Sequence, residues 1–159
     1  MTGVRACQSR SPRTETPRFD YAAAFDRNIG WLTDEEQHSL KHKRIAIAGM
    51  GGVGGVYLTT LARLGVGKFN ISDLDTFELA NFNRQAGAMI STLGRPKVEV
   101  LAEMAQDINA DCELELFPKG VTADNLERFF EGVDLYFAGL DAFAFEARKL
   151  VFAYCPARR

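Results

Sequence analysis

Short apolar runs and longer segments with helical spacing alternate along most of the chain. Nearly continuous apolar runs are typical of buried parallel strands, whereas the run Glu-Leu-Glu-Leu-Phe alternates like a strand exposed on one face. The predicted strands are residues 45–48, 69–72, 113–117 and 133–138. The predicted helices are residues 33–43, 53–64 and 96–108, a helix that begins at Thr122, and residues 142–154.

Several of these boundaries carry local signals. Thr33 and Glu36 have the spacing of a capping box, Pro96 suits the first turn of a helix, and Thr122 suits an N-cap. The apolar residues expected to face inward from the helix after Thr122 are Leu126, Phe129 and Phe130. The apolar residues with helical spacing in segment 53–64 are Val56, Leu61 and Leu64. The aromatic-rich segment Phe19–Trp31 is expected to pack against the domain, and residues 79–89 to form a polar linker with a short helical turn.

Four successive strand–helix units predict an α/β fold, a Rossmann-like parallel sheet of about four strands with helices on both faces. Right-handed crossovers favour the strand order 3-2-1-4. Ligands bind such sheets at the carboxyl ends of the strands, where the order reverses between strands one and four. This order places the loop at residues 49–54 next to Asp141.

Composition limits the remaining possibilities. A chain of 159 residues with 47% hydrophobic and 25% charged residues suits one soluble domain, residues 19–159, after an Arg-, Ser- and Pro-rich leader, residues 1–18, predicted to be disordered. The net charge of −2 predicts neither a nucleic-acid nor a membrane partner. The three cysteines lack metal-ligand spacing, and no secretory signal is evident, so a cytoplasmic location is the default.

The first strand ends in a glycine-rich loop, Gly49-Met50-Gly51-Gly52-Val53-Gly54. Gly49, Gly51 and Gly54 have the Gly-x-Gly-x-x-Gly spacing that allows a tight turn, close approach of a phosphate and close packing of helix on strand. A plain structural turn is the alternative, but the position between a strand and a helix favours nucleotide binding. Asp73 ends the second strand, where an acidic residue accepts hydrogen bonds from ribose hydroxyls.

Further charged residues follow this loop. Asp75 is either a turn residue or the partner of a metal or an arginine. Arg84 and Lys97 can be solvated surface charges, but two cations near a triphosphate can also neutralise charge that develops at the α-phosphate. Asp141 ends the fourth strand and can bind Mg²⁺, cap the last helix, or do both.

Together these motifs resemble the ThiF/MoeB/HesA adenylyltransferases, relatives of the ubiquitin-activating enzymes. The resemblance covers residues 25–154. It depends on Arg27 within Phe25-Asp26-Arg27-Asn28-Ile29, the glycine loop, Asp73-Leu74-Asp75, Asn81-Phe82-Asn83-Arg84-Gln85, Gly94-Arg95-Pro96-Lys97 and Asp141.

The resemblance implies ATP and Mg²⁺ as cofactors and adenylation of the C-terminal glycine carboxylate of a ubiquitin-like β-grasp protein. It assigns nucleotide contacts to Gly49, Gly51, Gly52, Gly54, Asp73, Asp75, Asn81 and Gln85, and magnesium to Asp141. It makes Arg84 and Lys97 the catalytic cations on the phosphates. Arg27 corresponds to an arginine that, in homodimeric members, reaches the neighbouring subunit's ATP site, so a homodimer is expected.

The chain also departs from the family pattern. Ala80 stands where serine is usual, and Ala142 where asparagine is usual. Family members continue for about another hundred residues, as the resemblance implies, so we expect an N-terminal fragment with a sheet incomplete at the C-terminus and an apolar face exposed at strand four. Cys155 is expected to be a core residue at a helix end.

Two alternatives stay open at this stage. A nicotinamide- or flavin-dependent oxidoreductase would explain the glycine loop and Asp73, although it requires neither Arg84 nor Lys97. A non-catalytic pseudo-adenylase would keep the fold for binding nucleotide or a partner. His38 and His42 are expected to lie on a solvated helix face.

Overall fold

A computed structural model describes residues 18–141 and 144–154 of the chain. Four parallel strands form one sheet: β1 (Arg44–Ala48), β2 (Lys68–Ser72), β3 (Glu113–Phe117) and β4 (Leu135–Ala138). Their order is β3-β2-β1-β4, which confirms the predicted order. The expected leader, residues 1–18, lies almost wholly outside the described residues.

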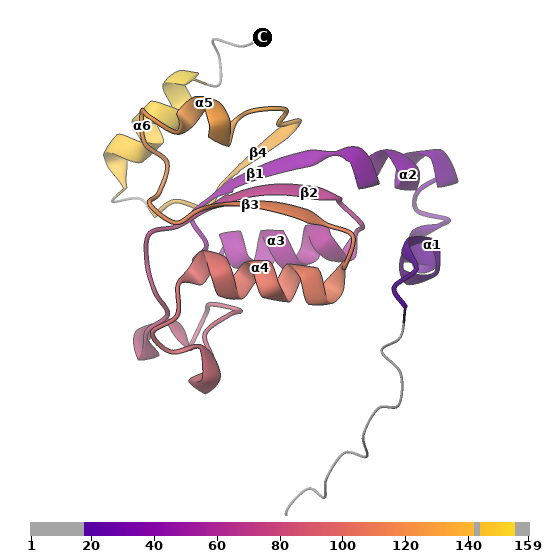
Figure 1. The fold of residues 1–159 in the computed structure, drawn as a ribbon, viewed down its shortest axis with the longest axis horizontal. Coiled ribbons are helices and arrows are strands. Elements are labelled where there is room, and N and C mark those ends of the chain that lie inside the picture. Colours follow the sequence, from indigo (N-terminus) through magenta and orange to yellow (C-terminus); the bar gives the residue numbers. More distant parts are fainter. Residues whose placement is uncertain (1–17, 142–143, 155–159) are drawn as a thin grey trace, which may run out of the picture.

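The helices cover both faces of the sheet, as predicted (Figure 1). One face carries α3 (Gly54–Arg63) and α4 (Lys97–Ile108), and the other carries α5 (Leu126–Phe129) and α6 (Phe145–Tyr154). Beyond the amino ends of the strands lie α1 (Tyr21–Phe25), the 3-10 turn η1 (Asp26–Asn28) and α2 (Asp34–His42). The linker between β2 and α4 contains two further 3-10 turns, η2 (Leu79–Asn81) and η3 (Ile90–Thr92).

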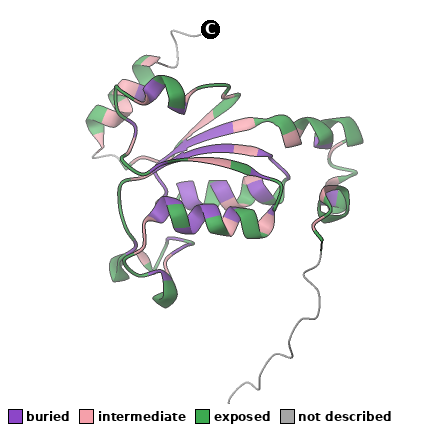
Figure 2. Cartoon of the chain, viewed as in Figure 1, coloured by how far each residue is buried: buried purple, intermediate pink, exposed green. Residues whose placement is uncertain are grey.

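The alternation of side chains along β1 explains how a single strand supports both layers. Ile45 and Ile47 belong to the larger core cluster, formed with α3 and α4, because successive side chains point to opposite faces. Ala46 and Ala48 belong to the second cluster, formed with Phe117 and the helices on the other face. The central strands are accordingly buried, whereas the outer strands are more exposed (Figure 2).

The helix boundaries confirm some local signals and correct others. Thr33 accepts a hydrogen bond from the Glu36 backbone N–H, and the Glu36 carboxylate accepts one from the Thr33 N–H, so the capping box is present. Thr122 is not an N-cap: its N–H donates to Asn125 Oδ1 instead, and α5 begins only at Leu126. The last helix begins at Phe145 rather than at residue 142. Residues 142 and 143 lie outside the described residues.

The side chains expected to face inward follow the prediction only in part. Leu126 and Phe129 are buried, and Phe130 packs against the same cluster. In α3 the fully buried residues are Leu58 and Ala62, whereas Val56 and Leu64 are 48% and 40% exposed and Leu61 packs against the core.

The aromatic-rich segment before α2 is buried at one position and exposed at its end. Phe25 is buried, as expected, but Trp31 is 92% exposed, so the prediction that the whole segment packs on the domain is wrong at its end. At the outer strand β4, Leu135 is 53% exposed, in agreement with the expected apolar face. No described helix has the length and apolar character that a bilayer crossing requires.

Candidate nucleotide-binding site

The glycine loop joins β1 to α3 at the carboxyl edge of the sheet. Gly49 has a φ of +91°, a conformation that favours glycine, and its N–H donates to the Ser72 carbonyl at 2.7 Å. A Cβ at Gly49 would lie 2.4 Å from the Gly139 carbonyl oxygen, and a Cβ at Gly54 would lie 1.7 Å from the Gly49 oxygen. The backbone itself therefore requires the first and third glycines of the motif.

Gly51 and Gly52 are glycines for a different reason. The heavy atom nearest to an added Cβ at Gly51 would be Gln85 Nε2, 3.8 Å away, and at Gly52 it would be the Arg84 carbonyl oxygen, 3.4 Å away. Neither close packing nor a positive φ requires glycine at these two positions. They leave bare, partly exposed backbone beside Arg84 and Gln85, which is the surface that a phosphate needs for close approach.

Asp73 holds the glycine loop in place. Its Oδ2 accepts a hydrogen bond from the Met50 N–H at 2.6 Å, and its Oδ1 accepts one from the Asp75 N–H at 2.8 Å. A carboxylate has about four acceptor sites, so capacity for a ribose hydroxyl remains. The ribose contact stays a prediction, and the structure adds a positioning role that sequence reasoning missed.

Arg84 and Gln85 lie against the loop from the linker between β2 and α4. The exposed guanidinium of Arg84 donates from Nη1 to the Ala80 carbonyl and to Asn83 Oδ1, both at 3.0 Å. Gln85 is 8% exposed, and its Oε1 has no hydrogen-bond partner among the described residues. A buried unpaired acceptor is costly, so this site has polar capacity that a ligand could use.

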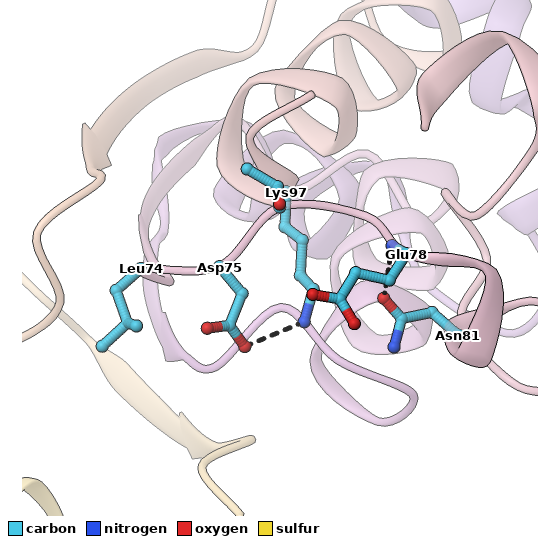
Figure 3. Close-up of a pocket in the computed structure, with 6 residues that line it drawn as sticks. Leu74, Asp75, Glu78, Asn81 and Lys97 are labelled. Carbon is cyan, nitrogen blue, oxygen red and sulfur yellow. Dashed lines mark hydrogen bonds and ion pairs between the residues drawn. The ribbon is translucent and has the colours of Figure 1, made fainter. Parts of the chain in front are cut away.

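A second group of polar residues surrounds a cavity of about 330 Å³ next to the loop, shown in Figure 3. Lys97 Nζ lies 3.1 Å from Asp75 Oδ2, and the side chains of these residues are 6% and 57% exposed. Of the alternatives for Asp75, the structure supports an electrostatic partner, although its cation is Lys97 rather than an arginine. The residues that line the cavity are Leu74, Asp75, Thr76, Glu78, Asn81 and Lys97.

An antiparallel bridge between Thr76 and Pro96 brings Lys97 to this cavity. Two backbone hydrogen bonds extend the contact, from the Phe77 N–H to the Arg95 carbonyl at 3.0 Å and from the Gly94 N–H to the Phe77 carbonyl at 2.9 Å. Lys97 then begins α4 with Pro96 as the N-cap residue. A buried cation there opposes the helix dipole, so the Asp75 carboxylate offsets part of the cost of its position.

Asn81 and Glu78 complete the polar side of the cavity. Asn81 Oδ1 accepts a hydrogen bond from the Glu78 N–H at 2.9 Å, which fixes the amide at the start of η2 (Figure 3). Glu78 was not among the site residues predicted from the sequence. Its position between the Asp73–Asp75 and Asn81–Gln85 motifs could have indicated that it lines the site.

Asp141 and Arg27 lie at opposite ends of the sheet. Asp141 is exposed and follows β4 by three residues, and Gly139, two residues before it, lies against Gly49, so the segment that carries Asp141 borders the glycine loop. Arg27 is also exposed, but its 3-10 turn follows α1 at the opposite end of the sheet (Figure 1). One chain therefore does not bring Arg27 to the candidate site.

The described residues suit one Mg²⁺ only in combination with phosphates. They contain no group of three or more His, Cys, Asp and Glu side chains that could hold a metal. Mg²⁺ at nucleotide sites commonly uses one or two carboxylates together with phosphate oxygens and waters, and the exposed Asp141 carboxylate fits that pattern.

Cys112 contributes nothing to this site. It is buried in the main core cluster, and burial raises the pKa of its thiol to about 11. The thiol is therefore protonated near neutral pH and is a poor nucleophile. Cys155 lies outside the described residues.

The comparison with protein families agrees with this arrangement. A family model described as "ThiF family" matches residues 25–159. The chain belongs to the ThiF family. The matched range includes both the glycine loop and the Lys97 segment.

Two kinds of curated relative share this domain. A tRNA threonylcarbamoyladenosine dehydratase of Bacillus subtilis (strain 168) is 35% identical over 123 residues, which are 77% of this chain and 48% of the relative. A ubiquitin-like modifier-activating enzyme 5 of Drosophila ananassae is 35% identical over 136 residues, which cover 78% of this chain and 34% of the relative. The chain thus spans about half the length of the first relative and a third of the second.

A solved structure shows the same fold with a nucleotide. The E. coli tRNA N6-threonylcarbamoyladenosine dehydratase TcdA in complex with ATP superposes with a TM-score of 0.80 at 27% identity, covering 86% of this chain and 56% of that one. ATP is therefore a ligand of a close structural neighbour, and this chain is a ThiF-family adenylyltransferase-like domain.

Proposed function

We propose that this domain binds ATP at the glycine loop and uses it to activate a substrate carboxylate as an acyl-adenylate. The observation that carries the proposal is the convergence of bare glycine backbone, Asp73, Arg84 and the unpaired Gln85 Oε1 at one edge of the sheet. These groups suit a nucleotide with its phosphates on the α3 side of the loop. The ATP complex of TcdA supports the same ligand.

In the proposed reaction a substrate carboxylate oxygen attacks the α-phosphorus of ATP. The new oxygen–phosphorus bond forms while the bond from the α-phosphorus to the bridging oxygen breaks, and that oxygen leaves with its electron pair in pyrophosphate. Arg84 and Lys97 stabilise the negative charge that develops on the phosphates, and no protein nucleophile is needed for this step. Asp141 would hold Mg²⁺, which when bound neutralises further phosphate charge.

To stabilise the phosphates, Lys97 would exchange its partner, the Asp75 carboxylate, for a phosphate oxygen. In the structure its Nζ pairs with Asp75 at 3.1 Å, so the ammonium is neutralised before ATP arrives. A phosphate in the adjoining cavity would compete with Asp75 for it. Because the lysine side chain is 6% exposed, its charge is less screened there than that of a surface lysine.

The substrate we favour carries its carboxylate on a tRNA. Three of the curated relatives with the highest similarity are tRNA threonylcarbamoyladenosine dehydratases, and a threonylcarbamoyl group has a free carboxylate that ATP can activate. The second candidate is the C-terminal glycine of a ubiquitin-like protein, which the ubiquitin-like modifier-activating enzyme 5 relatives favour. The net charge of −2 predicted no nucleic-acid partner, and the tRNA candidate departs from that prediction because it rests on the relatives' names.

A second copy of the chain is the expected source of Arg27 at the site. Arg27 is exposed at the far end of the sheet, so it can act on ATP only from a neighbouring subunit. The homodimer expected from the resemblance would meet that requirement. Sedimentation of the chain with and without ATP measures this association directly.

Calorimetric titration with Mg-ATP and, separately, with NAD tests the proposed function. We expect Mg-ATP to bind and Arg84→Ala to weaken that binding by about tenfold or more, because a charge-assisted contact to phosphate is worth about 1.5–3 kcal/mol. Arg63→Ala is the matched control, since Arg63 is an exposed arginine in the last turn of α3, away from the loop.

The outcomes separate the remaining alternatives. NAD binding that is insensitive to Arg84→Ala would support the oxidoreductase instead. ATP binding without pyrophosphate exchange, in the presence of either carboxylate substrate, would leave a pseudo-adenylase. Exchange that requires threonylcarbamoyl-tRNA, or the ubiquitin-like protein, would identify the substrate class.

A further inference from the structure

A pair of histidines lies at the end of α2, far from the glycine loop. His38 and His42 are the only histidines in the chain, and both are exposed. They stand four residues apart, so they share one face of the helix. Their Nε2 atoms lie 3.3 Å apart, within hydrogen-bond distance of each other, and their rings meet edge to face with centroids 4.9 Å apart.

We propose that His38 and His42 together bind a Zn²⁺ ion. Zinc–nitrogen bonds are about 2.0–2.1 Å long, so two nitrogens 3.3 Å apart would subtend an angle of about 104–111° at a shared ion. That interval contains the tetrahedral angle, the geometry that zinc adopts in most protein sites. Square-planar ions require a right angle and a shorter separation, so this pair favours zinc.

The helix supports a cation at this position. His42 is in the last turn of α2, where the unpaired carbonyls give the helix end a partial negative charge. The capping box at Thr33 fixes the other end of the helix, and its one buried residue, Gln37, donates to Tyr21 Oη and to the Leu64 carbonyl, both at 3.0 Å. The two rings are therefore carried by an anchored helix.

Two carboxylates and two cations surround the pair. Both histidines line an open hollow of about 900 Å³, whose other charged residues are Arg18, Asp20, Lys41 and Asp111. The Lys41 ammonium is the cation of α2 next to the pair, and it lies 3.0 Å from Asp111 Oδ2 and 4.6 Å from the centre of the Tyr21 ring. Its charge is thus compensated by other groups in the hollow.

The site is open. The described residues contain no cluster of three or more His, Cys, Asp and Glu side chains suited to a metal, so two coordination positions of the ion remain for water or an added ligand. An open two-histidine site binds reversibly and accepts an anionic ligand from the hollow. This distinguishes it from closed structural zinc sites with four protein ligands.

Zinc titration of the chain, prepared without a histidine tag, tests the proposal. Cys7 and Cys155 are replaced by serine so that their thiols do not compete for the ion. We expect one zinc ion per chain, and His38→Gln or His42→Gln should weaken binding by at least the roughly 10–100-fold that loss of an outer-sphere partner costs. With Co²⁺ as the probe, the absorption spectrum should show the intense bands of tetrahedral coordination.

A register variant provides the matched control. Glu35→His combined with His38→Gln keeps two histidines on the same helix face but separates them by seven residues, about 10 Å along the axis. Glu35 takes no part in the capping box, and circular dichroism confirms that each variant is folded. Equal zinc affinity in this variant and the parent, or no saturable binding by the parent, would overturn the proposal.

Discussion

The two ends of the sheet use their polar groups in opposite ways. In the amino half, Asn70 is fully buried, accepts from Arg44 Nη1 and donates to the Phe129 carbonyl, both at 2.8 Å. At the carboxyl edge, the buried Gln85 Oε1 has no partner among the described residues, and the Arg84 guanidinium is exposed. Buried unpaired acceptors are not confined to that edge, since Asn109 Oδ1, on the residue that follows α4, also lacks a partner among the described residues. The carboxyl edge differs because its unpaired acceptor lies beside an exposed guanidinium and bare glycine backbone.

The difference also appears in the charged residues. Asp134 accepts from Lys43 Nζ and from the Arg44 backbone N–H, both at 2.8 Å, so its carboxylate joins two strands. Asp73, at the other end, likewise accepts two N–H groups, one from Met50 in the glycine loop and one from Asp75 in the segment after β2, and both segments border the candidate site. Substitutions in the amino half should therefore change stability alone, whereas substitutions at the carboxyl edge should also change ATP binding.

The largest effect is expected at the glycine loop itself. Gly54→Ala would place a methyl group 1.7 Å from the Gly49 carbonyl oxygen, so we expect a loss of about 3 kcal/mol or more in the free energy of unfolding. In Gly51→Ala the atom nearest to the new methyl group is 3.8 Å away, so we expect the free energy of unfolding to stay within about 0.5 kcal/mol of the parent's value. ATP binding should weaken. Urea denaturation and calorimetry check both variants, and equal stabilities for the two would contradict the division of roles.

The next effect tests the amino half. Asn70→Ala leaves the Arg44 guanidinium and the Phe129 carbonyl without the amide, so we expect a loss of about 2–3 kcal/mol. The ATP affinity of the folded variant should be unchanged. Gln106→Ala, at an exposed amide side chain of α4, serves as the control, and a parallel loss of ATP binding in Asn70→Ala would show that the two ends are coupled.

A smaller effect is expected for Asp73→Asn. The side-chain oxygen of the asparagine can accept a hydrogen bond from the Met50 N–H or from the Asp75 N–H, but the amide nitrogen cannot accept one. One of these two N–H groups therefore loses its partner. We expect about 1–2 kcal/mol of lost stability and a clear loss of ATP affinity. Asp124→Asn, at an exposed aspartate, should change neither quantity.

The smallest effect depends on pH. Lys43 and the Arg44 N–H lower the pKa of Asp134, so its carboxylate stabilises the fold above the unfolded pKa near 3.9, and this contribution is lost as the pH falls through the lower folded value. The side chain is 37% exposed, so Asp134→Asn should cost no more than about 1 kcal/mol at neutral pH. Denaturation between pH 7 and pH 3 should show the difference from the parent shrinking in acid; a constant difference would exclude an ionic contribution.

Periodicity and motif spacing predicted the parts of the molecule that depend on local rules. The strand order followed from four strand–helix units and crossover handedness, and the glycine roles at Gly49 and Gly54 followed from backbone geometry. Positions set by tertiary contacts could not be predicted. Asn125, not Thr122, receives the hydrogen bond before α5, and Trp31 is exposed although its sequence neighbours are aromatic.

Within the site, the sequence identified residues but not all of their partners. Asp73 was predicted as a ribose ligand, yet its hydrogen bond from the Met50 N–H depends on where the chain turns after β1, whereas the bond from the Asp75 N–H is local. Lys97 was predicted as a cation near the triphosphate, but its pairing with Asp75 requires the Thr76–Pro96 bridge. Residues 22 positions apart in sequence carry no local signal for such a contact.

Because Thr76 and Pro96 form a bridge, the spacing of Asp75 and Lys97 does not depend on the length of the segment between them. The bridge closes the intervening segment at its base, so Asp75 and Lys97 keep their spacing whatever happens at the exposed tip near Ile90. Closing a longer loop costs only about 0.6 kcal/mol for each doubling of its length. The tip can therefore accept insertions without changing the spacing of Asp75 and Lys97 in the candidate site.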